Sequence, residues 1–154
     1  MNTITLTLPY PISANRYWAT RTVTPKGKKP MAMTYVTPEA KAFKAEVMQL
    51  VRAAGVVAPI IGRVQLEIKL YPHRPLDWQK RQRQAGAAWD DSVQCIDLGN
   101  AEKVLSDALK DLVMEDDRWI RKIISERMEP DALPARVVVT VSAMPKEVVN
   151  EELF

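Results

Sequence analysis

The side chains in this sequence best suited to chemistry are carboxylates in two short neighbourhoods. Asp97 and Glu102, with Lys103 beside them, lie at the predicted start of a helix, and Asp116 and Asp117 follow its predicted end. Carboxylates are the ligands that hard cations such as Mg²⁺ prefer. Bound Mg²⁺ polarises a phosphodiester and lowers the pKa of a water molecule, and a nearby lysine offsets negative charge in the transition state. The pattern therefore indicates metal-assisted phosphodiester hydrolysis.

Each of these groups also has an ordinary structural interpretation. Asp97 could serve only as a helix N-cap, Asp116 and Asp117 could form a turn, and Lys103 could be a solvated helix residue. Asp90 and Asp91 form a third and weaker acidic group upstream. Spacing alone leaves both interpretations open.

Several other chemistries are disfavoured by what the sequence contains. It has no GxxxxGK[ST] or GxGxxG motif, so we expect no nucleotide cofactor. His73 is the only histidine, which disfavours a histidine-centred hydrolase or a zinc site. Cys95 is the only cysteine and has no evident activating base, so we expect it to be a small apolar residue in a strand.

The basic residues favour an anionic partner. The net charge is +3, and the cations gather in two stretches that resemble loops. Such clusters neutralise phosphates, with binding that weakens steeply as salt rises; the alternative is that both stretches are merely solvated. The two clusters are Arg16, Arg21, Lys26, Lys28 and Lys29, and then Arg74, Lys80, Arg81 and Arg83.

Length and hydropathy predict a single globular domain. The chain has 154 residues, 47% of them hydrophobic and 27% charged, which suits one core. Its apolar runs are far shorter than the roughly 20 residues that span a bilayer, and the first residues lack a basic stretch and an apolar run, so we expect no export leader. We expect a cytoplasmic protein without membrane contact, in which residues 1–145 form one domain and residues 146–154 a short acidic C-terminal tail.

Periodicity predicts the elements that must position the candidate residues. The expected order is β-α-β-α-β-β, an α+β domain in which two main helices pack on a mixed sheet. Two long loops interrupt it, at 13–35 and 72–88, and the second could contain a short helix over 78–84. The expected strands are 3–8, 64–70, 119–128 and 136–142, and the expected helices are 37–55 and 98–112.

Three blocks of this sequence together resemble the RusA family of Holliday junction resolvases. Residues 8–18 resemble the family's opening strand and its Pro-x-x-Ser-x-Asn-Arg-aromatic loop. Residues 97–109 resemble its Asp-x-Asp-Asn motif with a downstream lysine and Asp-Ala-Leu, and Asp116-Asp117 resembles its third acidic site. The blocks occur in the family's order, and the match that rests on them covers most of the chain.

The resemblance implies a homodimeric, Mg²⁺-dependent endodeoxyribonuclease, with Mn²⁺ as a possible substitute, often carried by prophages. It implies paired symmetric nicks in four-way DNA junctions during recombination and repair. The catalytic positions of the family fall on Asp97, Lys103 and Asp117, and we expect Asp116 and Glu102 to join Asp97 and Asp117 as metal ligands. The residues expected to contact branched DNA are Asn15, Arg16, Tyr17, Lys28, Lys29, Arg74, Lys80 and Arg81.

One position departs from the family pattern, because Gly99 stands where the second aspartate of Asp-x-Asp-Asn is expected. The site could be dead, it could bind metal weakly with water in the gap, or Glu102 could reach back from the same helical face. We take the last as a working hypothesis.

Two alternatives to a nuclease remain within nucleic-acid binding, and a third lies outside it. The protein could bind junctions without cutting them, or bind nucleic acid without structural preference. It could also be an assembly protein with incidental acidic residues. Tyr17 and Trp18 do not decide between these alternatives, because they could stack on unpaired bases or cap the core.

Overall fold

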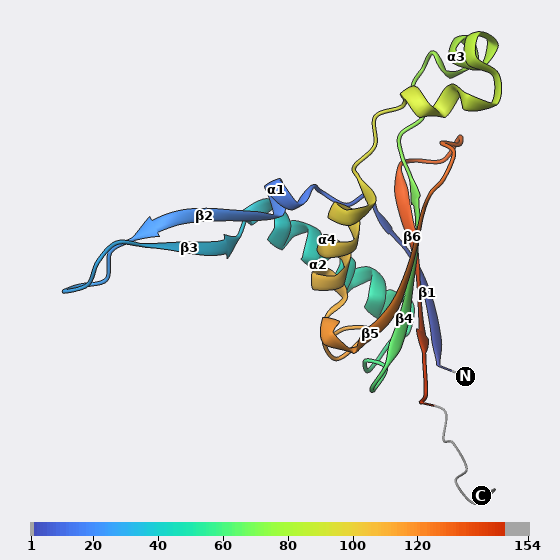
Figure 1. Cartoon of the computed structure of the whole chain (residues 1–154). Helices are drawn as coiled ribbons and strands as arrows, with labels where there is room; N and C mark the ends of the chain where they lie inside the picture. Colours follow the sequence, from blue (N-terminus) through green and yellow to red (C-terminus); the bar gives the residue numbers. More distant parts are fainter. Residues whose placement is uncertain (1, 147–154) are drawn as a thin grey trace, which may run out of the picture.

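The computed structural model describes residues 2–146, in which two helices cover one face of a four-stranded sheet (Figure 1). The strand order is β1-β6-β4-β5. β6 is antiparallel to both of its neighbours, whereas β4 and β5 run parallel. The mixed sheet confirms the predicted α+β class. The strands are β1 (Thr3–Pro9), β4 (Val64–Tyr71), β5 (Ile120–Arg127) and β6 (Arg136–Ala143).

The alternation of apolar residues in the central strands explains which face of the sheet is covered. In β4, Val64, Leu66, Ile68 and Leu70 are fully buried, and the residues between them are partly exposed. Valines of β6 alternate in the same way. Because burying one such side chain stabilises the fold by about 1.5–3 kcal/mol, this face forms the core against the helices.

The first long helix, α2 (Pro38–Ala53), begins and ends where its sequence predicts. Thr37 is the N-cap, and its hydroxyl accepts a hydrogen bond from the backbone N–H of Ala40 at 3.2 Å. Proline at the first helical position is already restricted to a helical φ. After the helix, Gly55 adopts a φ of 83°, a left-handed conformation that glycine tolerates.

The second long helix, α4 (Leu98–Leu109), ends three residues earlier than predicted. Lys110 leaves the helical conformation, with a ψ of 139°, and Asp111 has a φ of 66°. The N–H of Asp111 then donates to the carbonyl oxygen of Met114 at 2.7 Å, which turns the chain toward β5. Leu112 therefore packs against the core from a turn and not from the helix.

The prediction of a loop over 13–35 is wrong, because most of these residues form regular secondary structure. A short helix, α1 (Ala14–Tyr17), leads into an antiparallel ribbon of β2 (Trp18–Val23) and β3 (Met31–Val36). The ribbon projects from the body of the protein (Figure 1). Since both of its faces are largely exposed, its sequence carries no alternation of core and surface residues. The periodicity that reveals a half-buried strand is therefore missing.

The second expected loop contains the short helix that its sequence allowed. It forms α3 (Trp78–Ala85), followed by a 3₁₀ segment, η1 (Gly86–Ser92). Trp89 is buried and its indole N–H donates to Glu129 at 2.5 Å. The Arg74 guanidinium lies 4.4 Å from the centre of the Trp78 ring. These contacts hold the segment that contains α3 and η1 in place, and α3 itself buries no side chain.

From Glu147 onward, the predicted acidic tail lies outside the described residues. Between residues 2 and 146, none of the helices combines the length and the apolar character needed to cross a membrane.

Candidate active site

Asp97 occupies the N-cap of α4 and remains exposed. Its Oδ1 accepts a hydrogen bond from the backbone N–H of Asn100 at 2.9 Å, and its Oδ2 accepts one from the Asn100 side-chain amide at 2.9 Å. The N-cap interpretation is therefore confirmed. A carboxylate has about four acceptor sites, so the same bonds that orient Asp97 leave it able to bind a further group.

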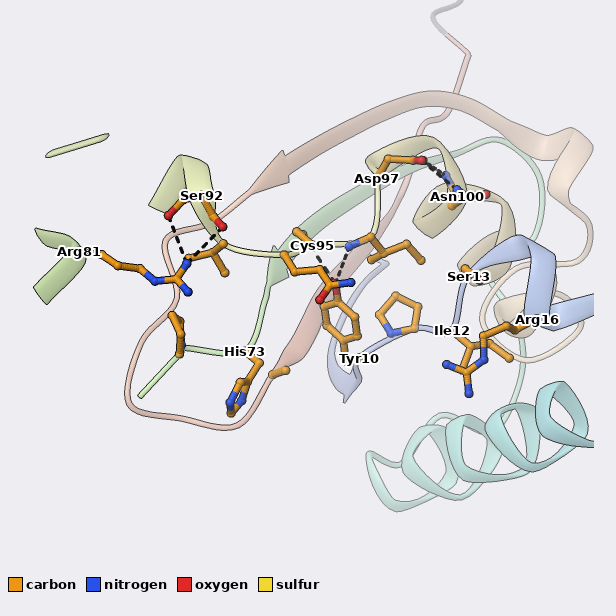
Figure 2. A pocket seen from close by; sticks show the side chains of 16 residues that line it. Tyr10, Ile12, Ser13, Arg16, His73, Arg81, Ser92, Cys95, Asp97 and Asn100 are labelled. Carbon is orange, nitrogen blue, oxygen red and sulfur yellow. Dashed lines mark hydrogen bonds between the residues drawn. The ribbon is translucent and has the colours of Figure 1, made fainter. Parts of the chain in front are cut away.

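Asp97 lies on the wall of a pocket of about 750 Å³, which we call the Asp97 pocket (Figure 2). The end of β1, the loop after β4, α3 and the segment before α4 supply its walls. The Tyr10 hydroxyl accepts from the N–H of Ile96 at 2.7 Å and donates to the Cys95 sulfur at 3.7 Å. Burial raises the pKa of Tyr10 to about 12, so its hydroxyl stays neutral. Cys95 is half-buried in an irregular segment, and its predicted place in a strand is wrong.

The other predicted catalytic residues line a separate pocket of about 400 Å³, which we call the Asp117 pocket. Glu102, Lys103 and Asp117 lie on its wall together with Trp18. Glu102 Oε1 accepts a hydrogen bond from the Ser125 hydroxyl at 2.6 Å. This bond connects Glu102 to β5 and does not direct it toward Asp97.

Asp116 and Asp117 are electrostatically coupled. The Asp116 carboxyl accepts a hydrogen bond from the Asp117 side chain and another, at 3.2 Å, from the backbone N–H of Arg118. Both bonds lower the pKa of Asp116. The hydrogen bond to Asp116 and partial desolvation raise the pKa of Asp117. Asp117 is therefore the member of the pair that binds a proton more readily.

Position 99 lies between the two pockets. Gly99 precedes Glu102, Lys103 and Ser106 by three, four and seven residues, so it shares their face of α4. A Cβ added at Gly99 would meet only Asp97 Oδ1, at 3.7 Å, an ordinary contact. A side chain at this position would therefore fit without strain, next to Asp97 and one turn from the Asp117 pocket.

The predicted metal ligands are not gathered within one chain. Among residues 2–146, no three His, Cys, Asp or Glu side chains lie close enough to hold one metal ion. Asp97 faces one pocket, whereas Glu102 and Asp117 face the other. Mg²⁺ often binds through one or two carboxylates plus substrate phosphates, so these residues fit a site that the substrate completes and do not fit a closed protein cage.

Tyr17 does not offer the DNA contact predicted for it. Its side chain is fully buried, its hydroxyl donates to Asp107, and Lys44 lies 3.4 Å from the same carboxylate. A buried ring offers no face to a base, so the core interpretation holds. Trp18 is half-buried, with its ring centre 4.3 Å from that of Tyr17.

The predicted DNA-contacting cations lie on two projections. Lys28 and Lys29 are exposed at the end of the ribbon, and Lys80 is exposed on α3. The ribbon and α3 leave the body in different directions, and α4 lies between them (Figure 1). Of the other residues predicted to contact DNA, Asn15 is exposed and Arg16 pairs with Glu39. Arg74 stacks on Trp78. Arg81 forms hydrogen bonds with Asp77 and Ser92.

Sequence reasoning missed the ribbon, the bond from Ser125 to Glu102, and the place of His73. One signal for the ribbon was present, since residues 18–36 contain four cations and no acid. His73, the only histidine of the sequence, lies exposed on the wall of the Asp97 pocket. Only the tertiary structure reveals that position.

An exposed carboxylate at the start of α4, set between two projections that carry exposed lysines, suits an enzyme that acts on nucleic acids. In a comparison with protein families, the model described as endodeoxyribonuclease RusA matches residues 9–142. The chain belongs to the RusA family of endodeoxyribonucleases, as its three motif blocks predicted. A comparison with curated proteins gave no match.

Proposed function

We propose that this protein is a cytoplasmic, Mg²⁺-dependent endonuclease that resolves four-way DNA junctions by paired symmetric nicks during recombination and repair. It acts as a homodimer, because two symmetric nicks require two equivalent sites. The observation that carries the proposal is the family match over residues 9–142, together with an exposed, oriented Asp97 beside a pocket at the start of α4.

The two projections supply the DNA-binding surface. Each ribbon strand has six residues, which gives a reach of about 20 Å, and a two-stranded ribbon fits the major groove of B-DNA. Lys28 and Lys29 at its end contact phosphates, and Lys80 on α3 contacts a second segment of DNA. Because α4 lies between the projections, DNA that contacts both passes the carboxylates.

The chain's own residues then have separate roles. Asp97, which its two bonds to Asn100 hold in place, would be a ligand of the metal. Lys103 offsets the charge of the phosphate in the transition state. Asp117 and Glu102 in the Asp117 pocket, and Asp116 next to Asp117, would complete the carboxylate set. Bound Mg²⁺, or Mn²⁺ in its place, would supply the polarisation of the phosphodiester and a lower pKa for a water molecule.

Gly99 and the separation of the two pockets favour a second candidate function, junction binding without nicking. A missing carboxylate at position 99 removes the group that would lie between Asp97 and the Asp117 pocket. The DNA-binding projections do not depend on that position. A protein of this kind would hold a junction and leave its strands intact.

A comparison of wild type with Asp97→Asn tests the nuclease proposal. Asparagine is an equally good N-cap, so the variant loses the charge and keeps the helix start. With a synthetic four-way junction in Mg²⁺, we expect nicking by wild type, none by the variant, and equal gel-shift affinities in EDTA. Junction binding by both proteins without nicking by either would favour the second candidate. Equal nicking by both would contradict the role of Asp97.

A further inference from the structure

The Asp97 pocket has a floor and a rim of different chemistry. We call the least exposed apolar part of its lining the floor: Pro11 and Val93 are buried, and Ile96 is half-buried. His73 and Asp97 are exposed on its wall. In Figure 2, His73 and Arg16 lie toward opposite ends of the pocket, with Tyr10 between them. An apolar floor with polar groups at the edge is the usual character of a site for a small organic group.

Hydrogen bonds fix two walls of this pocket before any ligand arrives. Tyr10 holds the segment before α4 through its bonds to Ile96 and Cys95. Arg81 bonds to the Asp77 carboxylate at 2.9 Å and to Ser92 Oγ and carbonyl oxygen, both at 3.2 Å. A preformed pocket binds with less loss of conformational entropy than one that must be ordered.

The geometry points to a flat heteroaromatic ligand, and we propose that the pocket takes an unpaired nucleotide from the centre of branched DNA. A site for phosphate alone would be lined by cations and backbone N–H groups, whereas this floor is apolar. Among the side chains of residues 2–146, His73 has no hydrogen-bond partner, so its imidazole is free. Histidine rings and guanidinium planes stack on unpaired bases, and His73 and Arg81 both lie on the pocket wall.

This inference rests on the proposed function and adds a reason why the protein would prefer four-way junctions to linear duplexes. A base in a linear duplex must break its pair and its stacking before it can enter a pocket, whereas the cost is smallest where pairing is already disrupted. Base pairs at the centre of an open four-way junction lack a stacked neighbour on one side, so a base there unpairs at a lower cost than one within an arm. A base held in the Asp97 pocket also brings its neighbouring phosphate toward Asp97, at the edge of the same pocket.

A junction that carries 2-aminopurine at the crossover tests the inference with the full chain in EDTA. Its fluorescence rises when the base leaves the stack. We expect a several-fold rise on binding when the probe is at the crossover and none when it is in the middle of an arm. The pocket-filling variant is Ala135→Leu, and the matched control is Ala132→Leu, which lies in the same loop outside the Asp97 pocket.

We expect Ala135→Leu to suppress the fluorescence rise and to reduce the junction-to-duplex affinity ratio by roughly tenfold, within the range for a stacked base. Ala132→Leu should behave as wild type. His73→Ala should weaken the rise, and His73→Phe should restore it, which keeps the test decisive if Ala135→Leu misfolds.

Three outcomes would overturn the inference or its basis. Tight junction binding without a fluorescence rise would refute the pocket assignment and leave the proposed function intact. A rise that Ala135→Leu and His73→Ala both leave unchanged would place the unstacked base elsewhere. Equal affinity for junction and linear duplex would refute the proposed function itself.

Discussion

Gly99→Asp would place a carboxylate between the Asp97 pocket and the Asp117 pocket, and the structure predicts that the fold accepts it. The residue lies in the first turn of α4 with a helical backbone, and an added Cβ meets one atom, Asp97 Oδ1, at 3.7 Å. No backbone shift is required. The consequences are therefore electrostatic and local.

The expected change in the free energy of unfolding is small because three terms nearly cancel. Replacing glycine in a helix by aspartate gains a few tenths of a kcal/mol, and an acid in the first turn adds about 0.3–1 kcal/mol. Repulsion between two exposed carboxylates about 4 Å apart costs about 1 kcal/mol in water. In EDTA, the variant should match wild type to within about 1 kcal/mol.

Mg²⁺ should change that balance, because a bound cation turns the repulsion into shared coordination. At a concentration 100 times its dissociation constant, a ligand stabilises the folded state by about 2.7 kcal/mol. We expect denaturant unfolding to show a gain of this order in Mg²⁺ for Gly99→Asp. Calorimetry should show tighter Mg²⁺ binding, and junction nicking should be faster than in wild type.

Two control variants separate charge from helix propensity in this experiment. Gly99→Asn has the same size without the charge, and Gly99→Ala should stabilise the helix by about 1 kcal/mol with no dependence on Mg²⁺. If Gly99→Asp binds Mg²⁺ no more tightly than Gly99→Asn, then position 99 does not belong to the metal site, and the reasoning from the shared helical face is refuted.

Three further predictions follow from single contacts. Tyr17→Phe removes a buried hydroxyl from its carboxylate partner and should lower the free energy of unfolding by about 1 kcal/mol in urea titrations; an unchanged midpoint would show that this bond contributes nothing. Changing Lys28 and Lys29 together to Gln should reduce the slope of log affinity against log salt by about two, and an unchanged slope would remove the ribbon from the DNA interface. Asp116→Asn removes the carboxylate that accepts the proton of Asp117, so the raised pKa of Asp117 should fall toward its ordinary value in an NMR pH titration; a pKa that stays raised would assign the shift to desolvation.

The pH dependence of the acidic pair has a definite sign. Because folding raises the pKa of Asp117, its contribution to stability is present at low pH and is lost as pH rises through the folded pKa. Folding lowers the pKa of Asp116, so its contribution is present above the unfolded pKa and is lost as pH falls through the folded pKa. The two contributions oppose each other, and the Asp116→Asn variant should therefore change how stability depends on pH in the acidic range.

Elements with local signals could be predicted from the sequence, and elements without them could not. The alternation in β4 and the Thr37 cap of α2 are written in neighbouring residues, and both occur in the structure as predicted. The ribbon over 18–36 has no buried face, so no periodicity revealed it. The end of α4 was misplaced because Leu112 continues the apolar stripe although the backbone has already turned at Lys110.

The same distinction applies to the candidate site. The residue types and the cap at Asp97 were predictable because both depend on a few consecutive residues. The separation of Asp97 from Asp117 depends on where β5 lies against α4, and the burial of Tyr17 depends on Asp107, ninety residues away. Such long-range placements leave no local pattern in a single sequence.

The most direct test of the account is strand mapping of products from a four-way junction with a fixed crossover, incubated with the wild-type protein in Mg²⁺ or in EDTA. The account predicts paired nicks at symmetric positions on opposite strands in Mg²⁺, none in EDTA, and none on linear duplexes of the same sequence. Nicks on the linear duplexes at the same rate would contradict junction resolution. Selective junction binding without nicks in Mg²⁺ would contradict the nuclease assignment and favour the second candidate function, junction binding without nicking.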